Sequence, residues 1–420
     1  MTEQKIMNRW LVVVGAILIQ LCLGAIYAWS VFTPYLKDPN GPFKFTATQT
    51  QAIFSVGLAV FALVMIFAGR LQQNLGPRPV CMAGGVLLGL GYILAKFFGH
   101  SFIGQVFCIG VIGGAGIGLA YVVPIAVGMK WFPDKKGMIT GLAVAGFGFG
   151  ATIWVKWAGA WGHLIDKYGV LNVFMLYGII FAVCVFLGSL VMVNPPAGWK
   201  PEGWTPPQAE GGKRLLGAMS FEPNEMLRTS QFYALWLTFI FSAMAGLMVI
   251  GCIKLFGIDS LQKIGMDKAS ASAAAGTAMA CLAIFNGLGR IVWGTVSDKI
   301  GRKAAIAIMC TLQGIMMLVF YFMGNAVTTL IIGAIIIGFN FGGNFALFPT
   351  ATADFFGLAN VGPNYGWVFT AYGAAGIFGP ILGGYVRDHY QTFLGAFIPA
   401  GIACLLGAVI MLMTKPPHKA

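Results

Sequence analysis

The sequence predicts an all-α integral membrane protein with twelve transmembrane helices in two pseudo-symmetric bundles of six. Three observations predict this fold: the overall hydrophobicity, the spacing of the apolar segments and motifs that recur in both halves. Of 420 residues, 58% are hydrophobic and 9% are charged, and the mean hydropathy is +0.82. Soluble domains carry about 25% charged residues, so this chain lacks the polar surface that a soluble fold presents to water.

The apolar segments have the length that a bilayer requires, which is about 20 residues for a helix. They occur near 9–36, 48–69, 77–98, 102–130, 137–163, 170–193, 230–258, 269–294, 303–323, 326–353, 363–387 and 391–414. A long polar stretch rich in Pro, Gly, Glu and Lys separates the sixth segment from the seventh. We therefore expect an N-terminal six-helix bundle at 1–193, a cytoplasmic linker at 194–229 and a C-terminal six-helix bundle at 230–420.

The basic residues predict the orientation in the membrane. With the N-terminus placed inside, the inner loops and termini contain sixteen Lys and Arg residues and the outer loops contain eight. Positively charged loops favour the cytoplasmic side, so we expect both termini to be cytoplasmic. The net charge of +13 is then a topology signal, and binding of nucleic acid is not expected.

The cysteines and histidines do not form a catalytic or metal-binding pattern. All eight cysteines lie in or beside apolar segments, no two are spaced as C-x-x-C, and the chain has four histidines. This predicts neither a disulfide framework nor a metal site, and no cofactor is expected. Because no His, Cys or carboxylate cluster lies at span depth, a membrane enzyme is also disfavoured.

Two loops repeat between the halves, about 225 residues apart. The loop at 69–78 follows the second span, and the loop at 294–303 follows the eighth; the second copy contains Gly294, Asp298, Gly301, Arg302 and Lys303. We interpret loop 294–303, here called the latch loop, as a conformational latch. We expect Asp298 to lie at a helix N-terminus, and Arg302 and Lys303 to pair with the ends of neighbouring helices. The first copy is eroded, with Gln73 and Pro77 at the positions of Asp298 and Arg302. The alternative is that loop 294–303 is an ordinary basic loop on the inner side and does not act as a latch.

Charged residues within spans are the sharpest functional signal, because each costs about 2.5–3.5 kcal/mol even on lenient insertion scales. Two bases lie inside spans, Lys156 in the fifth and Arg290 in the eighth. Asn286 lies four residues before Arg290 and shares its helix face. A guanidinium with a carboxamide suits one carboxylate, since arginine binds both oxygens at once. Alternatively, Arg290 extends to the inner surface, as we expect of Lys156 at the outer one.

Several stretches resemble one branch of a known family. They are Tyr27-Ala-Trp, Lys130-Trp-Phe-Pro-Asp134-Lys-Lys-Gly137, Phe285-Asn-Gly-Leu-Gly-Arg290 and Ala346-Leu-Phe-Pro349. Together with the latch loop, they are similar to the major facilitator superfamily, and within it to the oxalate/formate antiporter and monocarboxylate transporter branch. The resemblance implies two six-helix repeats facing a central cavity, and transport by alternating access.

The resemblance also implies a binding site. Arg290 would bind the substrate carboxylate with Asn286, and aromatic residues would surround it: Tyr27, Tyr121, Phe341, Phe345 and Phe369. Oxalate carriers have a lysine in the eleventh span where this chain has Tyr372, so one cationic anchor remains and a monocarboxylate is better matched than a dianion. For each aromatic residue, core packing or lipid contact is the alternative interpretation.

The expected function is transport of a small monocarboxylate, L-lactate above others, with a proton, as in bacterial L-lactate–proton symporters of the family. A proton-independent organic-anion exchanger of the oxalate/formate type is the alternative. Eukaryotic monocarboxylate carriers have an aspartate where this chain has Asn286, so the proton-coupling candidates are Asp267 and Asp259, with an N-terminal cap as the other role for Asp267. We expect a monomer in a bacterial plasma (inner) membrane.

Overall fold

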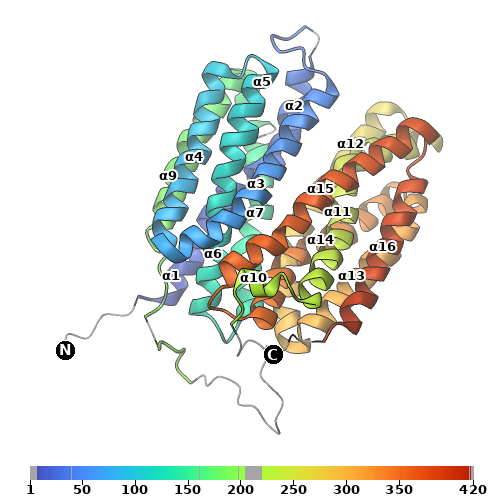
Figure 1. The fold of residues 1–420 in the computed structure, drawn as a ribbon. Coiled ribbons are helices and arrows are strands. Elements are labelled where there is room, and N and C mark those ends of the chain that lie inside the picture. Colours follow the sequence, from blue (N-terminus) through green and yellow to red (C-terminus); the bar gives the residue numbers. More distant parts are fainter. Residues whose placement is uncertain are drawn as a thin grey trace. The chain divides into compact units, whose positions relative to one another are not determined.

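The computed structural model describes residues 7–38, 40–159, 161–196, 198–203, 220–415 and 417. These residues are almost entirely helical (Figure 1). Residues 204–219 of the predicted linker lie outside the described residues, as do Lys5, Lys213, Arg214 and Lys419 of the inner-loop charges. The chain divides into two compact units: unit 1 is Met1–Leu215 with Val361–Pro363, and unit 2 is Leu216–Asn360 with Asn364–Ala420.

Unit 1 contains the first six predicted spans. Its elements are α1 (Arg9–Leu23), the 3₁₀ segment η1 (Gly24–Ala28), α2 (Trp29–Lys37), α3 (Ala47–Leu75), α4 (Pro77–Phe98), α5 (Phe102–Gln105), the π-helix η2 (Val106–Gly113), α6 (Gly114–Trp131), α7 (Lys136–Ala158), α8 (Leu164–Tyr168) and α9 (Val170–Ser189). The first predicted span is therefore three consecutive helical segments, and the fourth contains eight residues of π-helix. Such irregular turns are uncommon inside helices and often mark functional positions.

Unit 2 contains the last six predicted spans. Its elements are α10 (Pro223–Met226), α11 (Ser230–Lys263), α12 (Lys268–Ile300), α13 (Arg302–Met323), α14 (Val327–Phe356), α15 (Val361–Tyr390), whose first three residues group with unit 1, and α16 (Leu394–Met413). Eleven helices of the described chain are long and apolar enough to span a membrane. The twelfth long helix, α15, is not among these eleven; it contains Asn364, Arg387 and seven glycines. The predicted all-α membrane fold is confirmed.

The repeated loops have the same backbone geometry in both units. Gly76 joins α3 to α4 with φ +85°, and Gly301 joins α12 to α13 with φ +88°. Each glycine ends one helix and begins the next. Side chains with a Cβ rarely adopt this left-handed conformation, so a glycine is required at the turn. The internal repeat inferred from the sequence therefore has a matching structure in the two halves.

Glycines bring the spans into backbone contact where side chains would hold them apart. In unit 1, a Cβ on Gly24 would lie 2.1 Å from the carbonyl oxygen of Phe147, so α7 packs directly on η1. In unit 2, a Cβ on Gly342 would lie 2.0 Å from the carbonyl oxygen of Asn286. Close approach through small residues is the usual way that membrane helices associate. Both contacts occur beside residues predicted to bind substrate.

Candidate substrate-binding site

Arg290 lies in the second half of α12 and its side chain is fully buried, with 0% of its surface exposed. Its Nε–H donates a hydrogen bond to Oδ1 of Asn286, 3.0 Å away and one turn earlier on the same helix. Asn286 is itself buried. The carboxamide thus fixes the rotation of the guanidinium, whose carboxylate-binding fork is formed by the two Nη groups. Complete burial favours a role in a binding site over extension to the membrane surface.

An aromatic ring covers the guanidinium. The Cζ atom of Arg290 lies 4.1 Å from the ring centroid of Phe345 in α14, which is a cation–π contact. Phe341 packs edge-on against Phe345, with centroids 5.3 Å apart and an interplanar angle of 87°. Both phenylalanines are buried. Two of the predicted aromatic residues therefore form one continuous wall next to the arginine.

Helix α15 adds a second layer of rings to this wall. Tyr372 contacts Phe345 at 5.4 Å and Phe369 at 5.0 Å. Tyr365 lies one turn before Phe369 and packs against it at 5.6 Å, and it is fully buried. The sequence analysis missed Tyr365, although its spacing of four residues from Phe369 places both on one helix face. Unit 2 therefore brings together Asn286, Arg290, Phe341, Phe345, Phe369 and Tyr372.

Tyr27 and Tyr121 belong to unit 1 and meet around a residue that the sequence analysis did not select. The ring of Phe147 in α7 contacts Tyr27 at 5.0 Å and Tyr121 at 5.4 Å, both edge-on. Gln20 in α1 donates from Nε2 to the backbone oxygen of Tyr121, 3.2 Å away. Phe147 is flanked by Gly146 and Gly148, and those glycines were the available sequence signal. The two tyrosines form a separate aromatic group within unit 1.

The latch loop carries a network of ion pairs within unit 2. Arg302, the first residue of α13, pairs through Nη2 with Asp298 at 2.6 Å and through Nε with Asp354 at 2.9 Å. Asp298 occupies the last turn of α12, and Lys303 follows Arg302 in α13. Asp354 is a partner of Arg302 that the sequence analysis did not select. That Asp298 meets a helix N-terminus stays a prediction.

Unit 1 has an ion pair near the end of α6. Asp134 lies just after α6 in unit 1, and the loop residue matching Arg302 is Pro77, which has no charge. Asp134 instead pairs with Arg9 at the start of α1, with Nη1 and Oδ1 3.0 Å apart. The guanidinium of Arg9 also lies 4.3 Å from the ring centroid of Phe132. Arg9 is therefore the charged partner of Asp134, and the eroded first copy of the loop has no charge at position 77.

The two proton-coupling candidates lie in ordinary structural settings. Asp267 is the N-cap of α12, and its Oδ1 accepts hydrogen bonds from the backbone N–H groups of Ala269 and Ser270, each at 3.0 Å. Hydrogen bonds from Ser270, side chain and backbone, lower the pKa of this carboxyl below its usual value of 3.8. Asp259, near the end of α11, pairs with Arg387 in α15 at 3.3 Å.

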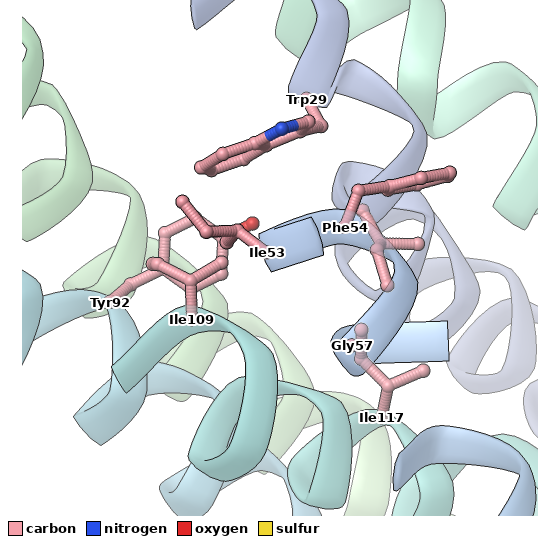
Figure 2. A pocket seen from close by; sticks show the side chains of 8 residues that line it. Trp29, Ile53, Phe54, Gly57, Tyr92, Ile109 and Ile117 are labelled. Carbon is pink, nitrogen blue, oxygen red and sulfur yellow. The ribbon is translucent and has the colours of Figure 1, made fainter. Parts of the chain in front are cut away.

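Unit 1 also contains an apolar pocket that neither Tyr27 nor Tyr121 lines. Its lining converges from η1, α2, α3, α4, η2 and α6 (Figure 2): Ile26, Trp29, Ile53, Phe54, Gly57, Tyr92, Ile109 and Ile117. Trp29 is fixed at its rim by a hydrogen bond from its indole N–H to the backbone oxygen of Thr50, 2.9 Å away. The pocket contains none of the predicted site residues, and its chemistry suits no anion. Among the described residues, no three His, Cys, Asp or Glu side chains gather as metal ligands.

The fold and the repeated loops agree with one family. The sequence profile of the Major Facilitator Superfamily matches residues 17–267 and 261–420. The chain belongs to this superfamily. Its members are transporters, not enzymes, so the protein is a multi-pass membrane transporter of the superfamily.

Curated relatives place the chain near carriers of organic anions. It is 31% identical to an MFS-type transporter of Escherichia coli, YhjX, with 88% of this chain and 86% of that protein covered. It is 27% identical to the oxalate:formate antiporter of Oxalobacter formigenes, covering 98% of this chain and 94% of the relative. Monocarboxylate transporter 13 of Rattus norvegicus is 27% identical, with 97% and 89% covered. The predicted resemblance to the oxalate/formate and monocarboxylate branch is confirmed.

Solved structures show the same fold. The fucose transporter FucP in its outward conformation superposes with a TM-score of 0.68 at 15% identity, covering 95% of this chain and 97% of that one. The proton:xylose symporter XylE superposes with a TM-score of 0.67 at 13% identity, covering 96% and 95%. At these identities the likeness concerns the fold alone.

Proposed function

We propose that the protein carries a small monocarboxylate, L-lactate above others, together with a proton, by alternating access. The observation that carries this proposal is the buried guanidinium of Arg290, oriented by Asn286 and covered by Phe345. A charge inside the membrane is costly, and a bound carboxylate would offset that cost through two parallel charge-assisted hydrogen bonds. The names of the relatives, which include an oxalate:formate antiporter and monocarboxylate transporters, support the substrate class.

A single carboxylate fits the surroundings of Arg290 better than two. The neighbouring side chains on α14 and α15 are Phe341, Phe345, Phe369 and Tyr372, all buried. A second carboxylate beside these rings would lose its hydration without gaining a cation, which costs several kcal/mol. The methyl group of lactate would instead contact the rings. Tyr27 and Tyr121 remain the proposed contributors of unit 1, as wall and as hydrogen-bond donor to the carboxylate or hydroxyl.

We propose the proton as the coupled ion because an electroneutral cycle avoids moving net charge across the bilayer. Asp267 is a helix cap whose hydrogen bonds lower its pKa, and Asp259 forms an ion pair with Arg387. The proposed cycle therefore binds the substrate at Arg290 as its carboxylate, and the proton is taken up separately, outside these two settings. We also propose a bacterial inner membrane location, cytoplasmic termini and a functional monomer.

Proton-independent anion exchange is the second candidate, favoured by the likeness to the oxalate:formate antiporter. Uptake of labelled lactate, pyruvate, acetate, formate and oxalate into proteoliposomes separates the two functions. A symporter accumulates lactate in empty vesicles when the outside is made acidic, whereas an exchanger requires a counter-anion inside. We expect acid-driven lactate uptake without internal substrate. Uptake of oxalate alone, or uptake only with internal anion, would contradict the proposal.

A further inference from the structure

Gly246, in the middle of α11, lies directly under the aromatic wall of the proposed site. A Cβ at this position would lie 2.2 Å from Cδ2, 2.5 Å from Cγ and 2.8 Å from Cβ of Phe341. In proteins, a Cβ atom essentially never lies closer than 3.0 Å to a heavy atom to which it is not bonded. The contact involves the base of the Phe341 side chain as well as its ring, so rotation of the ring alone does not relieve it.

The Phe341 ring is linked to Arg290, the proposed carboxylate anchor, through contacts with Phe345. It packs edge-on against Phe345 at 5.3 Å, and Phe345 lies 4.1 Å from the guanidinium of Arg290. Three contacts therefore link the backbone of α11 to the charged group: glycine to ring, ring to ring, and ring to guanidinium. Because protein interiors are close-packed, a displacement at Gly246 is transmitted along this series.

Helix α14 cannot shift away from α11, because its backbone already contacts that of α12. On the α12 side, a Cβ on Gly342 would lie 2.0 Å from the carbonyl oxygen of Asn286 and 2.9 Å from its carbonyl carbon. One helical turn away, a Cβ on Gly338 would lie 2.3 Å from the carbonyl oxygen of Leu282. The backbones of α14 and α12 are thus already in contact at the level of the site. Added volume at Gly246 must displace the Phe341 side chain.

We propose that Gly246 is a specificity-determining residue, which sets the space left for the substrate's side group by fixing Phe341 and Phe345 over Arg290. This inference rests on the proposed monocarboxylate function and deepens it. Gly246 does not contact the guanidinium itself, so it is a positioning residue. The Gly246→Ala change is expected to move the ring wall into the site, leaving the carboxylate anchor in place and reducing the volume for groups larger than hydrogen or methyl.

The test compares Gly246→Ala with Gly251→Ala, a matched control five residues later in α11. A Cβ on Gly251 meets only Cβ of Pro380 at 3.8 Å, an ordinary contact. Proteoliposome uptake is measured for formate, acetate, lactate and pyruvate. We expect Gly246→Ala to raise KM for lactate and pyruvate about tenfold or more, since one misplaced methylene is worth 10–200-fold in a binding pocket. KM for formate should change less than about twofold, and Gly251→Ala should match wild type for all four acids.

A double-mutant cycle with Phe341→Ala tests whether Gly246 acts on substrate selectivity through the Phe341 ring. If Gly246 acts through that ring, Gly246→Ala should have a much smaller effect in the Phe341→Ala background, because neighbours in contact are non-additive. Phe341→Leu alone, with Gly246 retained, should shift preference toward the larger acids. The Phe341→Leu variant keeps the test decisive if Gly246→Ala fails to fold. Additive effects in the cycle, or a fall in thermal stability with an unchanged order of substrates, would overturn the proposal.

Failure of this inference differs from failure of the proposed function. If no monocarboxylate is transported by wild type, the function itself is wrong. If wild type transports lactate and Gly246→Ala shows the same selectivity as Gly251→Ala, the function stands and the role of Gly246 is wrong.

Discussion

Arg290, the proposed carboxylate anchor, is held in place by its neighbours. Asn286 accepts the Nε–H and Phe345 covers the guanidinium face, so the group is oriented before any substrate arrives. Preorganised donors in a dry site act more strongly than the same donors in water.

Tyr372 gives a prediction on charge selectivity. It lies fully buried between Phe345 and Phe369, where the oxalate-type pattern has a lysine. Tyr372→Lys adds a second cation near the first, so a dicarboxylate would be paired at both ends. We expect oxalate to compete with lactate at least about tenfold better than in wild type. Competition assays on lactate uptake measure this, and an unchanged oxalate effect would count against this placement of Tyr372.

Asp267 gives a prediction on pH. Its pKa is lowered below 3.8, so it stabilises the folded state above the unfolded pKa and loses this contribution as pH falls through the lower folded value. Between pH 5 and 8 it stays ionised and is expected to carry no proton. Asp267→Asn keeps the cap, because asparagine caps nearly as well, and should preserve both acid-driven lactate uptake and lactate–lactate exchange. Loss of acid-driven uptake with intact exchange would show that Asp267 couples the proton.

At the scale of elements, α12 and α14 form the framework of the site. Glycines on both helices reduce their separation to backbone contact: Gly289 meets the carbonyl oxygen of Phe339, and Gly342 meets that of Asn286. The second contact lies on the very residue that orients Arg290. The packing of α14 on α12 and the orientation of the guanidinium therefore depend on the same residue, Asn286.

Gly342→Ala tests this framework. A methyl group there would overlap the Asn286 carbonyl, and overpacking of this kind costs about 1–3 kcal/mol. We expect a fall in the thermal midpoint of several degrees and a weaker affinity for lactate, because Asn286 shifts. The matched control is Gly276→Ala in α12, where a Cβ has nothing within 4 Å. Equal stability and affinity of Gly342→Ala and Gly276→Ala would refute the expected coupling of packing to binding.

The sequence predicted some of these features and not others for physical reasons. Charges inside apolar segments and an i, i+4 spacing were sufficient to select Arg290 and Asn286, because both signals are local. Tyr365 and Gly246 were missed because their roles depend on contacts between helices far apart in sequence. The breaks in the first and fourth spans were also missed, since η1 and η2 keep the same apolar composition as regular helix.

At the scale of the whole molecule, the repeat determines which parts are equivalent and which have diverged. Gly76 and Gly301 keep the same left-handed turn, so the helix junctions are conserved between the halves. The charges are not: unit 2 keeps the triad of Arg302, Asp298 and Asp354, whereas Asp134 of unit 1 pairs with Arg9. Arg290 is fully buried in the eighth span, and the position that corresponds to it in the second span is Met65, which has no charge. The proposed anchor is therefore asymmetric within a symmetric fold.

Binding of L-lactate to purified wild type and Arg290→Lys, measured by titration calorimetry, tests the central claim most directly. Lysine keeps the charge but lacks the fork and the Nε–H that Asn286 accepts. A hydrogen bond to a charged group contributes about 1.5–3 kcal/mol, so we expect wild type to bind lactate and the folded variant to lose at least about tenfold in affinity. Equal affinity of the two folded proteins would show that Arg290 is not the carboxylate anchor.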